Sequence, residues 1–147
     1  MQTLARDIMT KNVIAVNLNT TVEEAIQLFI KHGITGMPVT DKKGHVVGVV
    51  SELDILKSID TFMLDQIDQR CVLTLERTIE FTHKVTTIAE ETPLSEIMKL
   101  FIERRIRRVP VLSAKGRLVG IISRRDIMRI LYYRGRLAKL DAELQSL

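Results

Sequence analysis

The chain has 147 residues, 46% of them hydrophobic, which suits one globular domain with a buried core. No apolar run approaches the roughly 18 residues of a membrane span, the N-terminus lacks the apolar stretch of a secretory signal, and the single Cys71 excludes an internal disulfide. The net charge of +4 is uneven, because residues 1–84 hold 9 basic against 11 acidic residues and residues 85–147 hold 13 against 7. We therefore expect a cytoplasmic protein whose second half meets an anionic partner, although a solvated basic surface is the alternative.

The first third of the chain predicts alternating strands and helices. Thr20 is the expected N-cap of a helix with an apolar stripe, because Glu23 follows it at capping-box spacing. Pro38 belongs at the start or edge of a strand, since it has no N–H to donate. In order, we expect a strand over 13–16, a helix from Thr20 to Gly33, a strand at 37–39, a turn at 41–44, a strand over 46–50 and a helix from Ser51.

The same pattern returns 72 residues later. Laying residues 13–56 over 85–128 needs no gap, and 16 of the 44 pairs are identical. The second copy predicts a strand over 85–88, a helix with Thr92 as N-cap and Pro93 first inside it, strands at 109–112 and 118–122, and a helix from Ser123. Residues 57–84 read as helix plus connector, and residues 129–147 as an amphipathic helix that contains Gly135. Two copies of one β-α-β-β-α unit are predicted, closing on each other about a pseudo-twofold axis.

No catalytic or metal-binding set stands out in the sequence. The histidines His32, His45 and His83 occupy unrelated places in the repeat, without the spacing or the cysteine neighbours of a metal site. Nucleotide-binding glycine loops and the nucleophile motif of hydrolases are also missing. The sequence therefore argues against an enzyme.

A Ser-x-x-Asp motif follows the last strand of each copy, as Ser51 to Asp54 and Ser123 to Asp126. Either motif alone is explained by a helix cap worth about 1 kcal/mol. The same geometry also suits a nucleotide, because free amides at a helix start attract phosphate and a carboxylate accepts bonds from ribose hydroxyls. The preceding Gly48 and Gly120 would let such a ligand approach the strand backbone. Both interpretations stay open on the local sequence.

A basic run precedes the strand of the second copy. It spans residues 104–108, with four arginines, whereas the first copy has Gly33-Ile-Thr-Gly36 in that place. Arginines at a cleft mouth hold phosphate oxygens through paired hydrogen bonds, so one cleft would be basic and its mate nearly neutral. An exposed basic segment is the alternative explanation.

These motifs together resemble a tandem pair of CBS domains, a Bateman module, over nearly the whole chain. The resemblance rests on residues 7–10, 33–39, 44–48 and 107–111 with the two Ser-x-x-Asp motifs. It implies residues 1–72 as CBS repeat 1 with a connector helix and residues 73–147 as CBS repeat 2 with a C-terminal helix. It further implies a homodimer that senses AMP, ADP, ATP or S-adenosylmethionine and needs no cofactor or metal.

The resemblance also implies a ligand set in each cleft. Adenine would lie beside Val13, Ile14, Met37 and Pro38 in one cleft, with Asp54 on the ribose and Ser51 near phosphate. Thr35 and Gly36 belong to the same ligand set. The other set is Val85, Thr86, Val109, Pro110, Ser123 and Asp126, with Arg107 and Arg108 on phosphate. At the second cleft, residues 77–83 depart from the family's Asp-Ile-Met-Thr pattern, whereas the first cleft keeps this pattern as Asp7 to Thr10.

Two other functions compete with a nucleotide sensor. The first is a protein-interaction scaffold in which the Ser-x-x-Asp motifs serve only as caps, which a lack of binding to adenosine ligands would reveal. The second is nucleic-acid binding by the basic half, disfavoured because aromatic residues for base stacking make up only 4% of the chain. An effector protein is expected, but its nature is not encoded in any motif.

Overall fold

The computed structural model describes residues 2–59 and 75–147, and they form two compact units. The central unit is Ile14–Thr86, and the terminal unit joins Met1–Val13 to Thr87–Leu147. The terminal unit therefore takes residues from both ends of the chain. The predicted boundary between residues 72 and 73, most of the predicted connector helix, and Cys71 lie outside the described residues.

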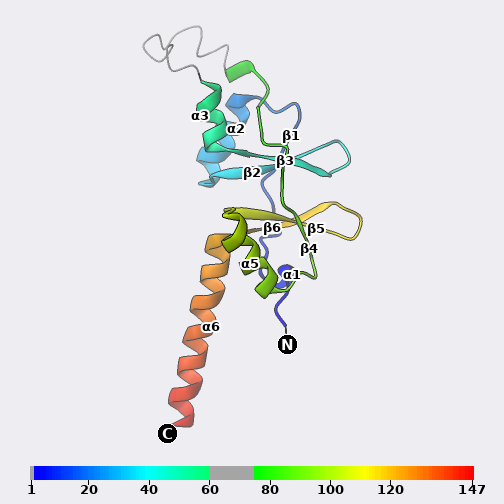
Figure 1. Cartoon of the computed structure of the whole chain (residues 1–147). Helices are drawn as coiled ribbons and strands as arrows, with labels where there is room; N and C mark the ends of the chain where they lie inside the picture. Colours follow the sequence, from blue (N-terminus) through cyan, green and yellow to red (C-terminus); the bar gives the residue numbers. More distant parts are fainter. Residues whose placement is uncertain (1, 60–74) are drawn as a thin grey trace. The chain divides into compact units, whose positions relative to one another are not determined.

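The central unit holds the first copy of the repeat. Its elements are β1 (Val16–Asn17), α2 (Val22–His32), β2 (Gly36–Thr40), β3 (Val46–Ser51) and α3 (Glu52–Ser58) (Figure 1). The sheet order is β1-β2-β3, with β1 parallel and β3 antiparallel to β2. The hairpin turns at Gly44, whose N–H donates to the Asp41 carbonyl at 3.1 Å and whose φ is 83°. The predicted β-α-β-β-α order is confirmed here.

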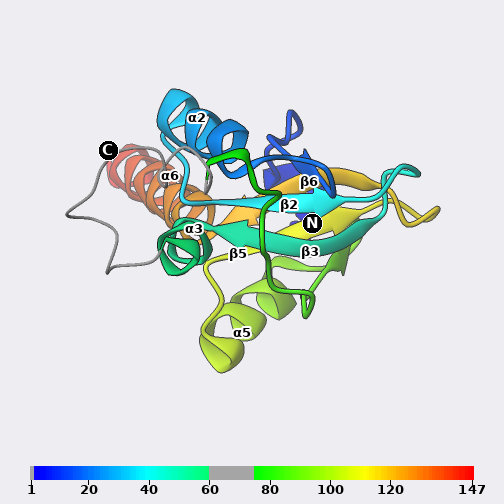
Figure 2. The same cartoon turned by 90° about the horizontal axis from the view of Figure 1, so that it is seen from above.

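The terminal unit repeats this order around the second copy. Its elements are α1 (Ala5–Ile8), β4 (Ile88–Ala89), α5 (Leu94–Arg104), β5 (Arg108–Leu112), β6 (Leu118–Ser123) and α6 (Arg124–Gln145). The sheet order β4-β5-β6 has the same parallel and antiparallel pairing. The hairpins β2–β3 and β5–β6 can be followed within their own units in Figure 2. The chain thus has the predicted mixed α/β class.

Each unit has its own apolar core between sheet and helices. In the central unit, Phe29 and Ala25 of α2 pack with Met37 and Val39 of β2. In the terminal unit, Phe101 and Ile97 of α5 occupy the equivalent places. Val39, Ile97 and Met37 are fully buried, so the apolar stripes read from the sequence are core faces, as predicted.

Four predicted boundaries are wrong by one to three residues. Only the ends of the predicted strands at 13–16 and 85–88 pair in the sheets, as β1 and β4. The N-caps are Thr21 and Pro93, each one residue later than Thr20 and Thr92. Thr20 closes the preceding turn, since its hydroxyl accepts from the Asn17 N–H at 3.0 Å, and Thr21 then caps the Glu24 N–H at 3.2 Å.

A crossing segment from the other copy completes each unit. Thr82 and Val49 exchange backbone hydrogen bonds of 3.1 and 3.0 Å in the central unit, and Thr10 and Ile121 exchange bonds of 2.9 and 3.0 Å in the terminal unit. Residues 77–83 therefore bond to the first copy, at the start of α2 and at β3, and residues 4–10 bond to the second copy, at the start of α5 and at β6. The repeat offset alone would group each segment with the copy that follows it in sequence, whereas strand pairing joins it to the other copy.

Candidate functional site

The Ser-x-x-Asp motifs form two matching capping boxes at the starts of α3 and α6. In each box, the serine N–H donates to Oδ2 of the aspartate at 2.8 Å and the serine hydroxyl donates to the same oxygen at 3.0 Å. The aspartate N–H in turn donates to the serine hydroxyl at 3.2 Å. The structural interpretation of these motifs as helix caps is thus confirmed in both copies.

Each capping box uses only one of the two oxygens of its aspartate carboxylate. Both serine bonds fall on Oδ2, so the box fixes the side chain of Asp54 or Asp126 while Oδ1 remains outside it. In the second copy, Arg129 Nη1 lies 3.9 Å from Oδ1 of Asp126. A carboxylate held in this way has a defined direction for accepting further bonds, so capping and ligand binding are compatible uses of one side chain.

The start of each hairpin strand lies beside the capping box. Arg108 is the register partner of Ser123 in β5–β6, and Gly36 is the partner of Ser51 in β2–β3. The N–H of Arg124 also donates to the Arg107 carbonyl at 3.1 Å. The fold therefore brings Arg107, Arg108, Ser123 and Asp126 together in the terminal unit, and Thr35, Gly36, Ser51 and Asp54 in the central unit.

Arg124 braces the basic segment, a role that the sequence analysis missed. Its Nε donates to the Ile106 carbonyl at 2.8 Å and its Nη2 to the Arg105 carbonyl at 3.0 Å. Arg105 needs this support because its φ is 52°, a left-handed conformation that costs a residue with a Cβ about 1 kcal/mol or more. The first copy has Gly33 at that place, and the exchange of a C-cap glycine for arginine was the available signal.

The other predicted ligand residues occupy two different environments. Met37, Pro38, Val109 and Pro110 are fully buried in the unit cores. By contrast, Val13, Ile14, Val85 and Thr86 are half-buried and lie where the chain passes between units. Val13 belongs to the terminal unit and the other three belong to the central unit.

The expected role of the strand glycines in ligand approach is wrong. A Cβ on Gly48 would overlap Cδ2 of Phe81 and the Thr82 carbonyl oxygen, and a Cβ on Gly120 would come within 2.7 Å of Met9 Cγ. The space beside both glycines is filled by the crossing segments of the chain itself. These glycines serve strand packing within each unit.

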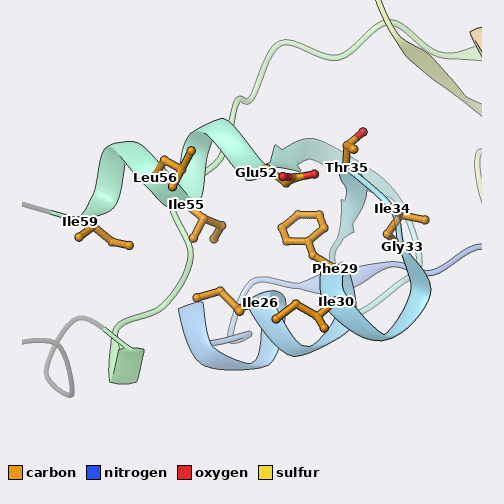
Figure 3. Close-up of a pocket in the computed structure, with 10 residues that line it drawn as sticks. All are labelled: Ile26, Phe29, Ile30, Gly33, Ile34, Thr35, Glu52, Ile55, Leu56 and Ile59. Atoms are coloured by element: carbon orange, nitrogen blue, oxygen red, sulfur yellow. The ribbon is translucent and has the colours of Figure 1, made fainter. Parts of the chain in front are cut away.

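An apolar groove of about 520 Å³ separates α2 from α3 in the central unit. Figure 3 shows Phe29 pointing from α2 toward α3, with Ile26 and Ile30 on one side of the groove and Ile55 and Leu56 on the other. Ile30 is 77% exposed and Leu56 is 63% exposed. Among the described residues that line the groove, Glu52 alone is charged. The groove suits an apolar side chain of another protein better than a nucleotide phosphate.

The described residues contain neither a cluster suited to a metal ion nor a helix suited to a membrane span. No group of three His, Cys, Asp or Glu side chains within residues 2–59 and 75–147 is arranged to hold a metal ion. In the same part of the chain, no helix has both the length and the apolar content of a membrane span.

The chain is similar to known proteins over nearly its whole length. The family model of the CBS domain matches residues 5–61 and again residues 77–133. An uncharacterised protein of Methanocaldococcus jannaschii, MJ1426, is 29% identical over 153 residues, which is 87% of this chain and 90% of that protein.

Two solved structures share the fold and contain adenosine compounds. The CBS domain pair of protein MJ0100, in complex with 5′-methylthioadenosine and S-adenosyl-L-methionine, is 31% identical with a TM-score of 0.73. That match covers 91% of this chain and 99% of the other. CBSX2 of Arabidopsis thaliana, in complex with AMP, is 29% identical with a TM-score of 0.73, covering 90% of this chain and 98% of the other.

Proposed function

Because the chain belongs to the CBS-domain family and carries two CBS domains, we propose that it is a regulatory module, not an enzyme, that binds an adenosine-containing ligand. The candidates are AMP, ADP, ATP and S-adenosylmethionine. The observation that carries the proposal is the second capping box, in which Ser123 fixes the Asp126 carboxylate and is the register partner of Arg108, next to Arg107. The complexes of MJ0100 and CBSX2 with such compounds support it.

Each polar residue of the second copy has a distinct proposed role. Oδ1 of Asp126 accepts bonds from the ribose hydroxyls, while Oδ2 keeps the helix capped. Arg107, which is exposed, and Arg108, which is half-buried, bind phosphate, and the Ser123 hydroxyl lies beside them. Arg124 positions this pair through the two carbonyls that it binds.

The first copy keeps the box but not the basic pair. Thr35 and Gly36 replace the two arginines, so Ser51 and Asp54 define a less charged site. We propose that this site prefers a ligand with less phosphate charge than the second site. The proposed adenine contacts of this site are Val13, Ile14, Met37 and Pro38. Those of the second site are Val85, Thr86, Val109 and Pro110.

We further propose a cytoplasmic homodimer that signals to an effector protein. The support is an exposed apolar helix face that recurs at the repeat offset. Ile30 and Leu56 in the central unit match Ile102 and Met128 in the terminal unit, which are 73% and 61% exposed. Apolar side chains grouped in this way on two helices are characteristic of a protein interface.

The test is thermal unfolding of the full chain with AMP, ADP, ATP and S-adenosylmethionine in turn. A ligand at a hundredfold its Kd stabilises the folded chain by about 2.7 kcal/mol, which raises Tm by roughly 5–10 °C at this size. Two variants test whether the ligand binds at the proposed site of the second copy. Asp126→Ala removes the ribose acceptor, and Arg107→Thr with Arg108→Gly converts the second copy to the residues of the first.

The matched control is Lys115→Ala, which removes one positive charge from the exposed turn of the same hairpin. We expect it to keep the full ligand-induced rise in Tm. The arginine variant should bind a phosphate-bearing ligand at least about tenfold more weakly, since each charge-assisted bond contributes roughly 1.5–3 kcal/mol. Because every rise is measured against the same variant without ligand, loss of the helix cap does not affect it. No rise with any compound would contradict the proposal and favour a scaffold.

A further inference from the structure

Helix α6 runs on past the rest of the terminal unit (Figure 1). Its free part carries exposed apolar side chains. Every residue from Leu131 to Leu147 is exposed. Within this stretch, Tyr133, Leu137, Leu140 and Leu144 are 63%, 61%, 48% and 67% exposed. A cytoplasmic helix seldom leaves four large apolar side chains in one row facing water, so this row needs a partner.

The spacing of the row identifies the kind of partner. The four residues are separated by four, three and four positions, the a and d positions of a coiled-coil heptad. Gly135 then falls at the f position on the opposite side, where a Cβ would meet nothing within 4 Å. Ile130, one step earlier in the pattern, is half-buried in its own unit and marks where the free row begins. The row thus suits pairing with another helix of the same pitch.

Charges on either side of the row are divided along the helix. The flanking e and g positions carry Arg134 and Arg136 in its first half and Asp141 and Glu143 in its second half. Charges at these positions set the choice and the orientation of the partner helix. A helix that is basic at one end and acidic at the other is complementary to a reversed copy of itself.

The two possible orientations differ in their charge pairs. In a parallel pair, Arg136 would face Asp141 of the second copy, but Arg129 would face Arg134, so attraction and repulsion offset each other. In an antiparallel pair with Tyr133 opposite Leu144, Arg134 faces Asp141 and Arg136 faces Glu143, each twice by symmetry. The same register sets Leu137 opposite Leu140.

We propose that residues 133–144 of α6 bind the same segment of a second copy of this chain as an antiparallel coiled-coil pair. The Arg134 guanidinium also donates to the Thr3 hydroxyl of its own unit, and its other N–H groups serve the pair. The segment shares no residue with the helix face around Met128 proposed above for the homodimer. This pairing therefore needs neither that interface nor a bound ligand.

Disulfide cross-linking tests the pairing and its direction. On a Cys71→Ser background, Tyr133→Cys and Leu144→Cys chains are oxidised separately and as an equal mixture. In the antiparallel register, residue 133 of one chain lies opposite 144 of the other, whereas two copies of residue 133 are about 16 Å apart along the helix, beyond disulfide reach. Lys139→Cys, on the outer side of the helix, is the control for random collision.

We expect a cross-linked dimer in the mixture and only the control level in each chain alone. Cross-links between identical positions would overturn the antiparallel arrangement, and no cross-link above the control would overturn the pairing. In the mixed sample, Arg134→Glu with Arg136→Glu should lower the cross-link yield severalfold. Adding Asp141→Lys and Glu143→Lys to both chains should restore the yield. A cross-link yield that is the same in all these variants would refute the argument for charge complementarity.

Discussion

Alanine substitutions at the equivalent positions Gly48 and Gly120 should both lower the stability of the fold, but by different amounts. In both units the new methyl group would enter space held by a crossing segment, well inside 3.0 Å of its atoms. Overpacking of this kind costs about 1–3 kcal/mol, which lowers Tm by roughly 2–12 °C for a chain of this size. The neighbours differ, however, and this difference sets the order of the two effects.

At Gly48 the methyl group meets the backbone carbonyl oxygen of Thr82 as well as the ring of Phe81. The carbonyl belongs to a strand bridge and yields little, so Gly48→Ala should be the more damaging change. At Gly120 the neighbours are Sδ, Cγ and Cβ of Met9, with Cγ at 2.7 Å and Cβ at 2.9 Å, and the thioether can swing away. We therefore expect the smaller loss for Gly120→Ala.

Double variants measured by urea unfolding make the comparison decisive. Met9→Ala removes Sδ and Cγ, so it should be less harmful in the Gly120→Ala background than in the natural chain. Phe81→Ala leaves the Thr82 carbonyl in place, so it should rescue Gly48→Ala only in part. Gly135→Ala is the control, because its methyl group meets nothing and should raise stability by about 1 kcal/mol. Wild-type stability for Gly48→Ala, or its full rescue by Phe81→Ala, would refute this reasoning.

Four further substitutions test the local geometry. Ser51→Ala and Ser123→Ala should each lower the free energy of unfolding by about 1 kcal/mol in urea titrations, through loss of a helix cap. Arg105→Gly should raise it by up to about 1 kcal/mol, because glycine adopts a positive φ without strain. The pKa of Asp41 lies below its ordinary 3.8, chiefly through the N–H of His45, so its contribution is present above that pH and lost as pH falls through the lower folded-state pKa. The stability gap between wild type and Asp41→Asn should accordingly shrink in acid.

The repeat units were predictable because their signals are local. Gly33 and Gly44 were correctly placed at a helix end and a turn, where both take a positive φ. The capping boxes at Ser51 and Ser123 were found for the same reason, since all their bonds join residues three apart. The misplaced cap at Thr20 shows the limit of such signals. Two adjacent threonines both fit the pattern, and only the turn bond from Asn17 decides between them.

The exchange of crossing segments was not predictable from periodicity. Thr10 and Thr82 are separated by the repeat offset, yet each pairs with a strand of the other copy, Thr10 with Ile121 and Thr82 with Val49. Strand pairing at such sequence separation depends on packing of the whole unit, which no local pattern records. Likewise, the filled space beside Gly120 follows from the position of Met9 and not from the residues that flank the glycine.

The two copies differ in charge far more than in backbone geometry. The N–H of Glu52 donates to the Thr35 carbonyl and that of Arg124 to the Arg107 carbonyl, both at 3.1 Å. The capping-box distances also agree to the decimal. The side chains at these equivalent positions differ. The second copy has Arg107 and Arg108, and Arg124 binds the backbone of the segment just before them. A duplicated scaffold can therefore carry different charge at equivalent positions while helix caps and strand register stay constant, so under the proposed function a few side chains set the ligand preference of each copy.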